Sequence, residues 1–161
     1  MKHFRMLARY NTVANQRLYG ACACLDDREY RQPRTGSFGS IHALLNHILL
    51  ADGIWMSRFE GGGRTTPPLD TVLHVDFAEL RAARVAEDAR IERYFEGLDA
   101  AALDRRFPYT NSKGISCIEE APVAFAHFFN HQTHHRGQIH VMLSQTAVAP
   151  PSLDLHRIVN P

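Results

Sequence analysis

The chain has little cysteine, and this shortage excludes a disulfide framework. Its three cysteines, Cys22, Cys24 and Cys117, include no Cys-x-x-Cys pair. On a helix, Cys22 and Cys24 would point about 200° apart and could not share a metal ion, because each residue turns the helix by ~100°. Reduced, partly buried thiols are therefore the expected state of these side chains.

The chain also lacks an excess of either charge and a long apolar run. Its 18 Lys and Arg residues balance 17 Asp and Glu residues, which leaves no electrostatic footprint for nucleic acid or an anionic membrane. The most apolar stretch, Ile41–Trp55, is interrupted by polar residues and is too short to cross a bilayer. The segment Met1–Arg5 has no apolar signal core behind it. We expect a cytoplasmic protein with no nucleic-acid or membrane partner.

What the sequence does contain is helical periodicity. With 161 residues, of which 45% are apolar, the chain has the size and composition of a single domain, residues 1–161, with a substantial core. Apolar residues at helical spacing predict four long helices, over about residues 3–25, 40–61, 77–98 and 118–145. Four amphipathic helices in a chain of this length indicate an all-α fold, a four-helix bundle.

Polar and glycine residues mark where these helices begin and end. Ser37 or Ser40 can cap the second helix, which should end at the run Gly61–Gly63, and Asp76 can cap the third. A proline-containing connection, residues 64–75, joins these two helices. The turn-rich residues 103–117, before the last helix, predict a short irregular or hairpin segment.

The most informative motif, Asn130–Gln138, lies in the last predicted helix and contains His131 and His135. Helical projection places His135 about 20° and His131 about 60° from the centre of the apolar stripe, so both imidazoles face inward. The neighbouring histidines, His127 among them, project to the flanks or the surface. Because His127 is also one turn from His131, it stays open as an alternative ligand.

A third histidine, His47, projects inward from the second predicted helix. Its neighbours on the helix face are apolar, whereas His42 and Asn46 project to the polar side. One histidine on an apolar face is commonly a hydrogen-bonded core residue, but a buried imidazole without a partner is costly. His47, His131 and His135 together therefore predict a site for one divalent metal ion per chain. Zinc is the preferred ion, and nickel or iron(II) are alternatives.

Several side chains near the motif have predicted supporting roles. Gln138 lies on the His131 side of the helix and is expected to support a ligand, touch substrate, or simply satisfy backbone or water. Gly137 predicts close helix packing, and Arg136 a structural ion pair or a dimer contact. Trp55 is expected to pack in the core, with the wall of a pocket as the alternative.

The segment Asn130–Gln138 resembles the signature of the DinB/YfiT-like family of metal-dependent enzymes. The run His47–Trp55, the string Phe107–Asn111 and the tail string Leu153–Leu155 are also similar to family features, in the right order along the chain. The resemblance implies a four-helix bundle, a homodimer, and three metal-binding histidines that map onto His47, His131 and His135. No departure is seen at these positions.

The expected chemistry follows from three neutral ligands that leave one metal position open. The resemblance implies thiol (S-)transferase chemistry, in which a low-molecular-weight thiol attacks a small electrophilic substrate. The projections place no general base beside the histidines, which also favours this reading. A hydrolase that uses a metal-bound water is the first alternative, and a non-catalytic metal-binding bundle is the second. A di-iron carboxylate bundle is rejected because the helices carry no Glu-x-x-His motif.

Overall fold

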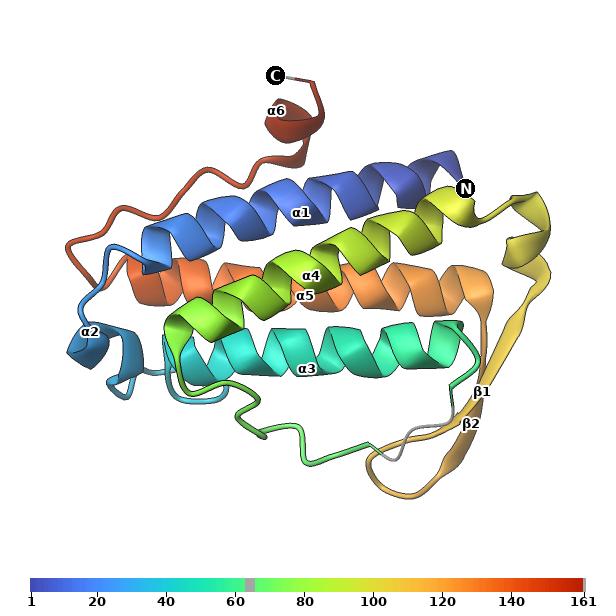
Figure 1. The fold of residues 1–161 in the computed structure, drawn as a ribbon, viewed down its shortest axis with the longest axis horizontal. Coiled ribbons are helices and arrows are strands. Elements are labelled where there is room, and N and C mark those ends of the chain that lie inside the picture. The colour runs from blue at the N-terminus through green and yellow to red at the C-terminus, as the bar shows by residue number, and fades with distance from the viewer. Residues whose placement is uncertain (63–65, 161) are drawn as a thin grey trace.

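Four long helices form the body of the molecule, as the periodicity predicts (Figure 1). The computed structural model describes residues 1–62 and 66–160, so Gly63 of the glycine run and Arg64 and Thr65 of the predicted connection lie outside it. The long helices are α1 (Lys2–Cys22), α3 (Ile41–Phe59), α4 (Phe77–Gly97) and α5 (Ala121–Leu143). Three short helices accompany them: α2 (Asp27–Arg31), the 3-10 helix η1 (Ala100–Asp104) and α6 (Leu155–Val159).

The all-α expectation needs one addition, because the segment before α5 contains a small sheet. Strands β1 (Arg106–Thr110) and β2 (Ser116–Glu120) pair antiparallel, with Phe107 opposite Glu119 and Tyr109 opposite Cys117. Asn111 shapes the turn, since its Oδ1 accepts hydrogen bonds from the backbone N–H groups of Lys113 and Ile115. The hairpin alternative predicted for this segment is therefore correct.

The helix ends follow the predicted capping chemistry. The Ser40 hydroxyl accepts a hydrogen bond from Ala43 N at the start of α3, and the Asp76 carboxylate accepts one from Glu79 N at the start of α4. At the end of α3, Gly61 takes a positive φ of 82°. Gly61 N and Gly62 N then donate to the Arg58 and Ser57 carbonyls, and this pattern of bonds is a Schellman stop.

The order of the helices in space requires one long crossover. Helices α1 and α3 each pack against both α4 and α5. Because α3 and α4 run in the same direction, the chain must return along the length of the bundle between them, and Figure 1 shows this crossover beneath α3. We use "crossover" for its described part, residues 66–76.

The predicted exposure of His42 and Asn46 on a polar face of α3 is wrong, because the crossover covers Asn46 and α2 covers His42. Asn46 Oδ1 accepts hydrogen bonds from Leu73 N and His74 N of the crossover, each at 2.9 Å. His42 Nδ1 lies 3.1 Å from the Tyr30 hydroxyl of α2. Both α3 residues are buried, because a helix face that is polar in sequence is here covered by polar partners from elsewhere in the chain.

A layer of polar side chains crosses the core and separates two apolar clusters. One cluster, near the hairpin, is rich in phenylalanine from α3, α4 and α5; the other lies around the start of α3 and the end of α5. Between them every long helix contributes buried polar residues. This polar layer consists of Asn11 and Asn15 of α1, Asp52 of α3, Arg84 and Asp88 of α4, and Gln132 and Arg136 of α5.

Ion pairs and hydrogen bonds join the polar layer across the helices. Arg84 Nη1 lies 2.5 Å from Asp52 Oδ2, and Arg84 Nη2 lies 2.9 Å from Asp88 Oδ1. Asp88 also accepts from the amides of Asn11 and Asn15, at 3.1 and 2.9 Å. The guanidinium of Arg136 donates to the amide oxygens of the same two asparagines. Two buried cations thus balance two buried carboxylates.

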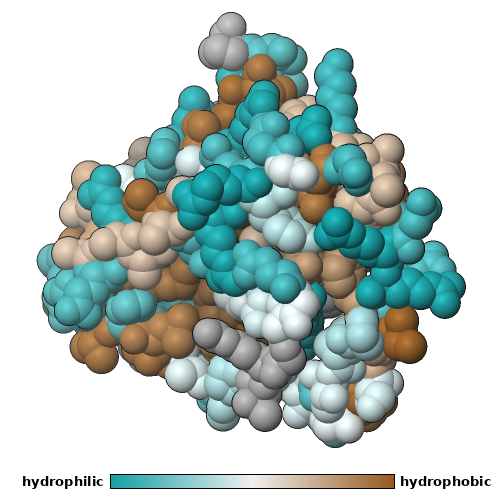
Figure 2. All heavy atoms as spheres, turned by 45° about the vertical axis from the view of Figure 1, so that its right-hand side comes forward, coloured by the Kyte–Doolittle hydropathy of each residue, from teal (hydrophilic) through white to brown (hydrophobic). Residues whose placement is uncertain are grey.

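The outer surface alternates between hydrophilic and apolar residues. Figure 2 shows brown apolar surface along the lower edge, on the side where the crossover runs in Figure 1, interrupted by teal hydrophilic side chains. The crossover exposes Leu69, Val72, Leu73 and Val75. Among residues 1–62 and 66–160, no helix is long and apolar enough to cross a membrane.

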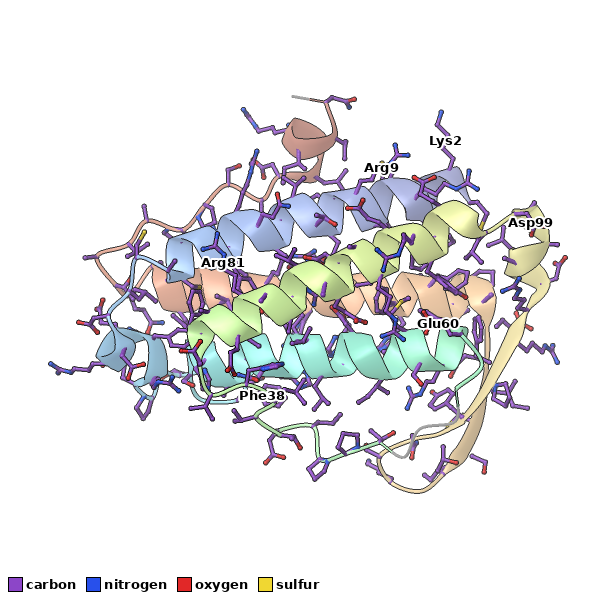
Figure 3. All side chains as sticks on the ribbon, viewed as in Figure 1. Lys2, Arg9, Phe38, Glu60, Arg81 and Asp99 are labelled. Atoms are coloured by element: carbon purple, nitrogen blue, oxygen red, sulfur yellow. The ribbon has the colours of Figure 1, made fainter. Side chains whose placement is uncertain are left out.

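Removal of the central cation should destabilise the fold strongly. Arg84→Met leaves Asp52 and Asp88 buried without their common partner, so we expect the free energy of unfolding to fall by about 3–5 kcal/mol. Urea denaturation measures this change. Arg81→Met is the matched control, because Arg81 is exposed on the same helix (Figure 3), and it should shift stability by no more than about 0.5 kcal/mol. A loss below about 1 kcal/mol for Arg84→Met would contradict the role of the polar layer.

Candidate metal centre

The structure brings His47, His131 and His135 together at one point between α3 and α5. His131 and His135 lie one turn apart on α5, and His47 faces them from α3. The three Nε2 atoms form a nearly equilateral triangle: His47 to His131 is 3.3 Å, His47 to His135 is 3.2 Å and His131 to His135 is 3.1 Å. His127 lies outside this cluster, and the third imidazole of the cluster is that of His131.

Hydrogen bonds on the far side of two rings determine which nitrogen carries the proton. His47 Nδ1 lies 2.8 Å from the Leu69 carbonyl oxygen, and His135 Nδ1 lies 2.8 Å from Gln138 Oε1. Both partners are acceptors, so in each ring Nδ1 is the donor and the Nε2 of the neutral imidazole carries a lone pair. The predicted supporting role of Gln138 is realised in this contact, while its Nε2 donates to Ser37 Oγ at 3.3 Å.

Burial keeps all three imidazoles neutral. Desolvation lowers the pKa of His47 and of His135, although the hydrogen bonds that these rings donate to the Leu69 carbonyl and to Gln138 Oε1 oppose this shift. Burial, reinforced by the neighbouring imidazoles of His135 and His47, lowers the pKa of His131 to about 3. Neutral imidazole is the form that coordinates a metal ion.

The triangle fits a divalent ion better than it fits hydrogen bonding among the rings. With the proton of each ring on Nδ1, the Nε2 lone pairs of His47 and His135 lie 3.2 Å apart, and of the three rings only His131 could donate a proton toward them. An ion about 2.0–2.1 Å from each nitrogen at tetrahedral angles needs nitrogens about 3.3–3.4 Å apart. The observed edges of 3.1–3.3 Å are close to this spacing. The donor set therefore suits zinc, and nickel or iron(II) also accept imidazole.

Phe38 packs directly on the centre from the loop before α3. Its ring stacks on His47 with centroids 3.8 Å apart, and it meets His135 edge-on at 5.9 Å. Figure 3 shows Phe38 below α3, beside the crossover. Its backbone has φ of 64°, a left-handed conformation that costs a non-glycine residue about 1–3 kcal/mol. The surrounding structure holds this strained position, which keeps an apolar ring against the ligand cluster.

A cavity of about 290 Å³ opens beside the centre. His47 and His131 line one end of it, and α3 contributes Ile54, Trp55 and Arg58. The rest of the wall includes Leu69 from the crossover, Tyr109, Asn111 and Ser112 from the hairpin, and His127. Among the described residues that line this cavity, none is an aspartate or a glutamate, which agrees with the absence of a general base in the projections.

The other side chains near the motif depart in part from expectation. Trp55 packs against the apolar cluster near the hairpin, as predicted, and it also lines the wall of the cavity, which was the alternative prediction. Arg136 is buried and binds asparagines of α1, so the dimer contact is wrong. Gly137 is exposed, and a Cβ placed there would meet nothing within 4 Å, so the predicted close packing is wrong too.

Sequence reasoning missed three parts of the site. Phe38 precedes the second predicted helix, and a left-handed backbone at a phenylalanine has no signal in the sequence. The Leu69 carbonyl is a backbone group, so the residue type at this position gives no indication that it accepts a hydrogen bond from His47. Arg58 did have a signal: it follows Trp55 by three residues and therefore shares its helix face.

A helical bundle with one crossover and three clustered histidines defines a class of candidate metal-binding proteins. Residues 1–160 match the sequence profile of the DinB family, and the chain belongs to that family. It is 29% identical over 153 residues to Protein DinB of Bacillus subtilis (strain 168), an alignment that covers 92% of this chain and 88% of that protein. The resemblance inferred from the motif is thereby confirmed.

The hydrogen bonds on the far ring nitrogens predict a tautomer that can be observed directly. In protein stripped of metal with a chelator, His47 and His135 should both be neutral at pH 7 with the proton on Nδ1, because the Leu69 and Gln138 oxygens accept it. Long-range ¹H–¹⁵N correlation spectra of the imidazoles distinguish the two tautomers. A proton on Nε2 of either ring would contradict the geometry; exposed His156 serves as the reference for an unconstrained ring.

Proposed function

We propose that the chain holds one divalent metal ion through the Nε2 atoms of His47, His131 and His135, and that it is a thiol (S-)transferase. The observation that carries the metal assignment is the pair of lone pairs on His47 and His135, which face each other at 3.2 Å. Membership in the DinB family supports the same ligand set. Zinc is the ion we propose, because all three donors are neutral imidazoles at tetrahedral spacing.

The residues that line the cavity favour thiol transfer over the other reactions that a three-histidine metal centre can perform. A bound divalent ion lowers the pKa of a thiol and holds its sulfur in place for attack on an electrophile. The described residues of the cavity provide no carboxylate to take a proton from water. Ile54, Trp55 and Leu69 give the cavity apolar walls that suit a small electrophile.

The protein's own groups orient the ligands of the proposed centre. The Leu69 carbonyl fixes the ring of His47 and Gln138 fixes that of His135, so neither imidazole has to reorganise when the ion binds. Phe38 covers the outer face of His47. These contacts come from the loop before α3, the crossover and α5, so the site depends on segments outside the helix pair that carries the ligands.

Hydrolysis is the second candidate, and one observation favours it. His127 lies one turn from His131 on α5 and lines the same cavity, with its ring 5.2 Å from that of Trp55. An imidazole there is the one basic side chain near the centre, among the described cavity residues, that can accept a proton from water. The experiments below separate this candidate from thiol transfer.

Metal content tests the ligand assignment. Untagged protein should contain about one divalent ion per chain, and His47→Ala or His135→Ala should remove most of it, because two imidazoles bind far more weakly than three. Inductively coupled plasma mass spectrometry measures the content. His140→Ala, on α5 but outside the cluster, should retain the ion. Full occupancy in the His135→Ala protein would overturn the assignment.

Cobalt substitution tests the chemistry. Binding of a low-molecular-weight thiol should produce an intense near-ultraviolet sulfur-to-cobalt charge-transfer band, because the thiolate is the ligating form of the sulfur. The proposal predicts this band with at least one of glutathione, cysteine, bacillithiol and mycothiol, and its loss in His47→Ala. An unchanged spectrum with all four, together with ester or amide hydrolysis that disappears in His127→Ala, would replace thiol transfer with hydrolysis. Without either result, a non-catalytic metal-binding role is the better interpretation.

A further inference from the structure

Arg58 lies in the wall of the cavity beside the proposed metal centre. It is placed on α3 one turn after Trp55, and its guanidinium carbon lies 4.6 Å from the centroid of the Trp55 ring and 4.0 Å from that of Tyr109. The rings of Trp55 and Tyr109 meet edge-on with centroids 5.4 Å apart, so the planar cation packs against both an aromatic side chain of the bundle and one of the hairpin. Arg58 also lines a second cavity, of about 780 Å³, that extends along the hairpin.

This cation has no acidic partner among the described residues, within the 4 Å limit of an ion pair. Its contacts with oxygen are long: Nη2 lies 3.3 Å from Thr66 Oγ1 and 3.5 Å from the Thr110 carbonyl. A guanidinium carries five N–H groups, so most of its donors remain available in the cavity. Burial lowers the pKa of Arg58.

We infer that the small molecule which occupies the cavity carries a carboxylate, and that Arg58 binds it beside Trp55 and Tyr109. A planar fork of donors matches the two oxygens of a carboxylate, and the aromatic walls fix the plane in which that group can lie. A single cation suits a singly charged group. The inference rests on the proposed function, because a thiol that carries a carboxylate would contact the ion and Arg58 together.

The aromatic contacts alone offer a purely structural role for Arg58. A guanidinium packed against both rings stabilises the position of the hairpin against α3 whether or not an anion binds. The two roles differ in one respect: a structural Arg58 gives no preference for an anionic ligand. The test therefore compares ligands that differ in charge and protein variants that keep or lose the cation.

The experiment uses zinc- or cobalt-loaded full-length protein and three small probes. 3-Mercaptopropionate has a thiol and a carboxylate, 2-mercaptoethanol has the thiol alone, and propionate has the carboxylate alone. Trp55 is the only tryptophan, so its fluorescence reports occupancy beside Arg58, while the cobalt band reports sulfur binding. We expect 3-mercaptopropionate to bind about tenfold or more tightly than 2-mercaptoethanol. Propionate should quench or shift the Trp55 emission in a saturable way.

Variants at Arg58 separate the carboxylate site from the metal chemistry. Arg58→Gln should abolish the preference for 3-mercaptopropionate and the response to propionate, and leave 2-mercaptoethanol affinity unchanged; Arg58→Lys should retain part of the preference. Arg81→Gln, with the same change in charge on α4, should behave as the parent protein. Circular dichroism and thermal melting verify that each variant is folded.

Two results would overturn the inference: equal affinity for both thiols in the parent protein, or a propionate response that survives in Arg58→Gln. Tighter binding of inorganic phosphate than of propionate would also overturn the carboxylate assignment. If no thiol gives a cobalt band while propionate still acts through Arg58, the inference stands and thiol transfer fails. If 2-mercaptoethanol gives the cobalt band but 3-mercaptopropionate binds no more tightly than it does, thiol transfer stands and the inference fails.

Discussion

The buried ion pairs of Arg84 with Asp52 and Asp88 are the constraint on which the rest of the structure depends. Charges removed from water are costly unless they are paired with good geometry, and here the pairs link α3 with α4 while Asn11 and Asn15 bring in α1. Displacement of one helix by a single residue would separate these partners. The polar layer therefore favours one register of the four helices, which two apolar clusters alone would specify less sharply.

This register also sets the geometry of the candidate metal centre. On α5, Arg136 directly follows His135, so one face of the helix contributes to the polar layer and the adjacent face carries the ligands. On α3, Asp52 lies five residues after His47 and is oriented toward α4, while His47 is oriented toward α5. Contacts on one side of each helix thus determine where the imidazoles on the other side meet.

How much could be predicted from the sequence depends on the range of the interaction. The helix ends follow from local capping, as Ser40 and Asp76 illustrate, and the inward direction of His47, His131 and His135 follows from helical periodicity. The burial of Asn46 could not be predicted, because the crossover that covers it is distant in sequence and has no periodic pattern. The burial of His42 required α2 to be placed against α3. The position of Arg58 beside Trp55 and Tyr109 likewise required the hairpin to be placed against α3.

The hairpin is the part of the cavity wall that is least tied to the bundle. Its strands pair with each other, Phe107 is its buried anchor, and its turn residues reach the cavity through Asn111 and Ser112. Substitutions in that turn change the walls of the cavity and leave both the polar layer and the three histidines intact. The lining of the cavity can therefore vary in this architecture while the four helices keep their packing, because the turn and the helices are separate parts of the structure.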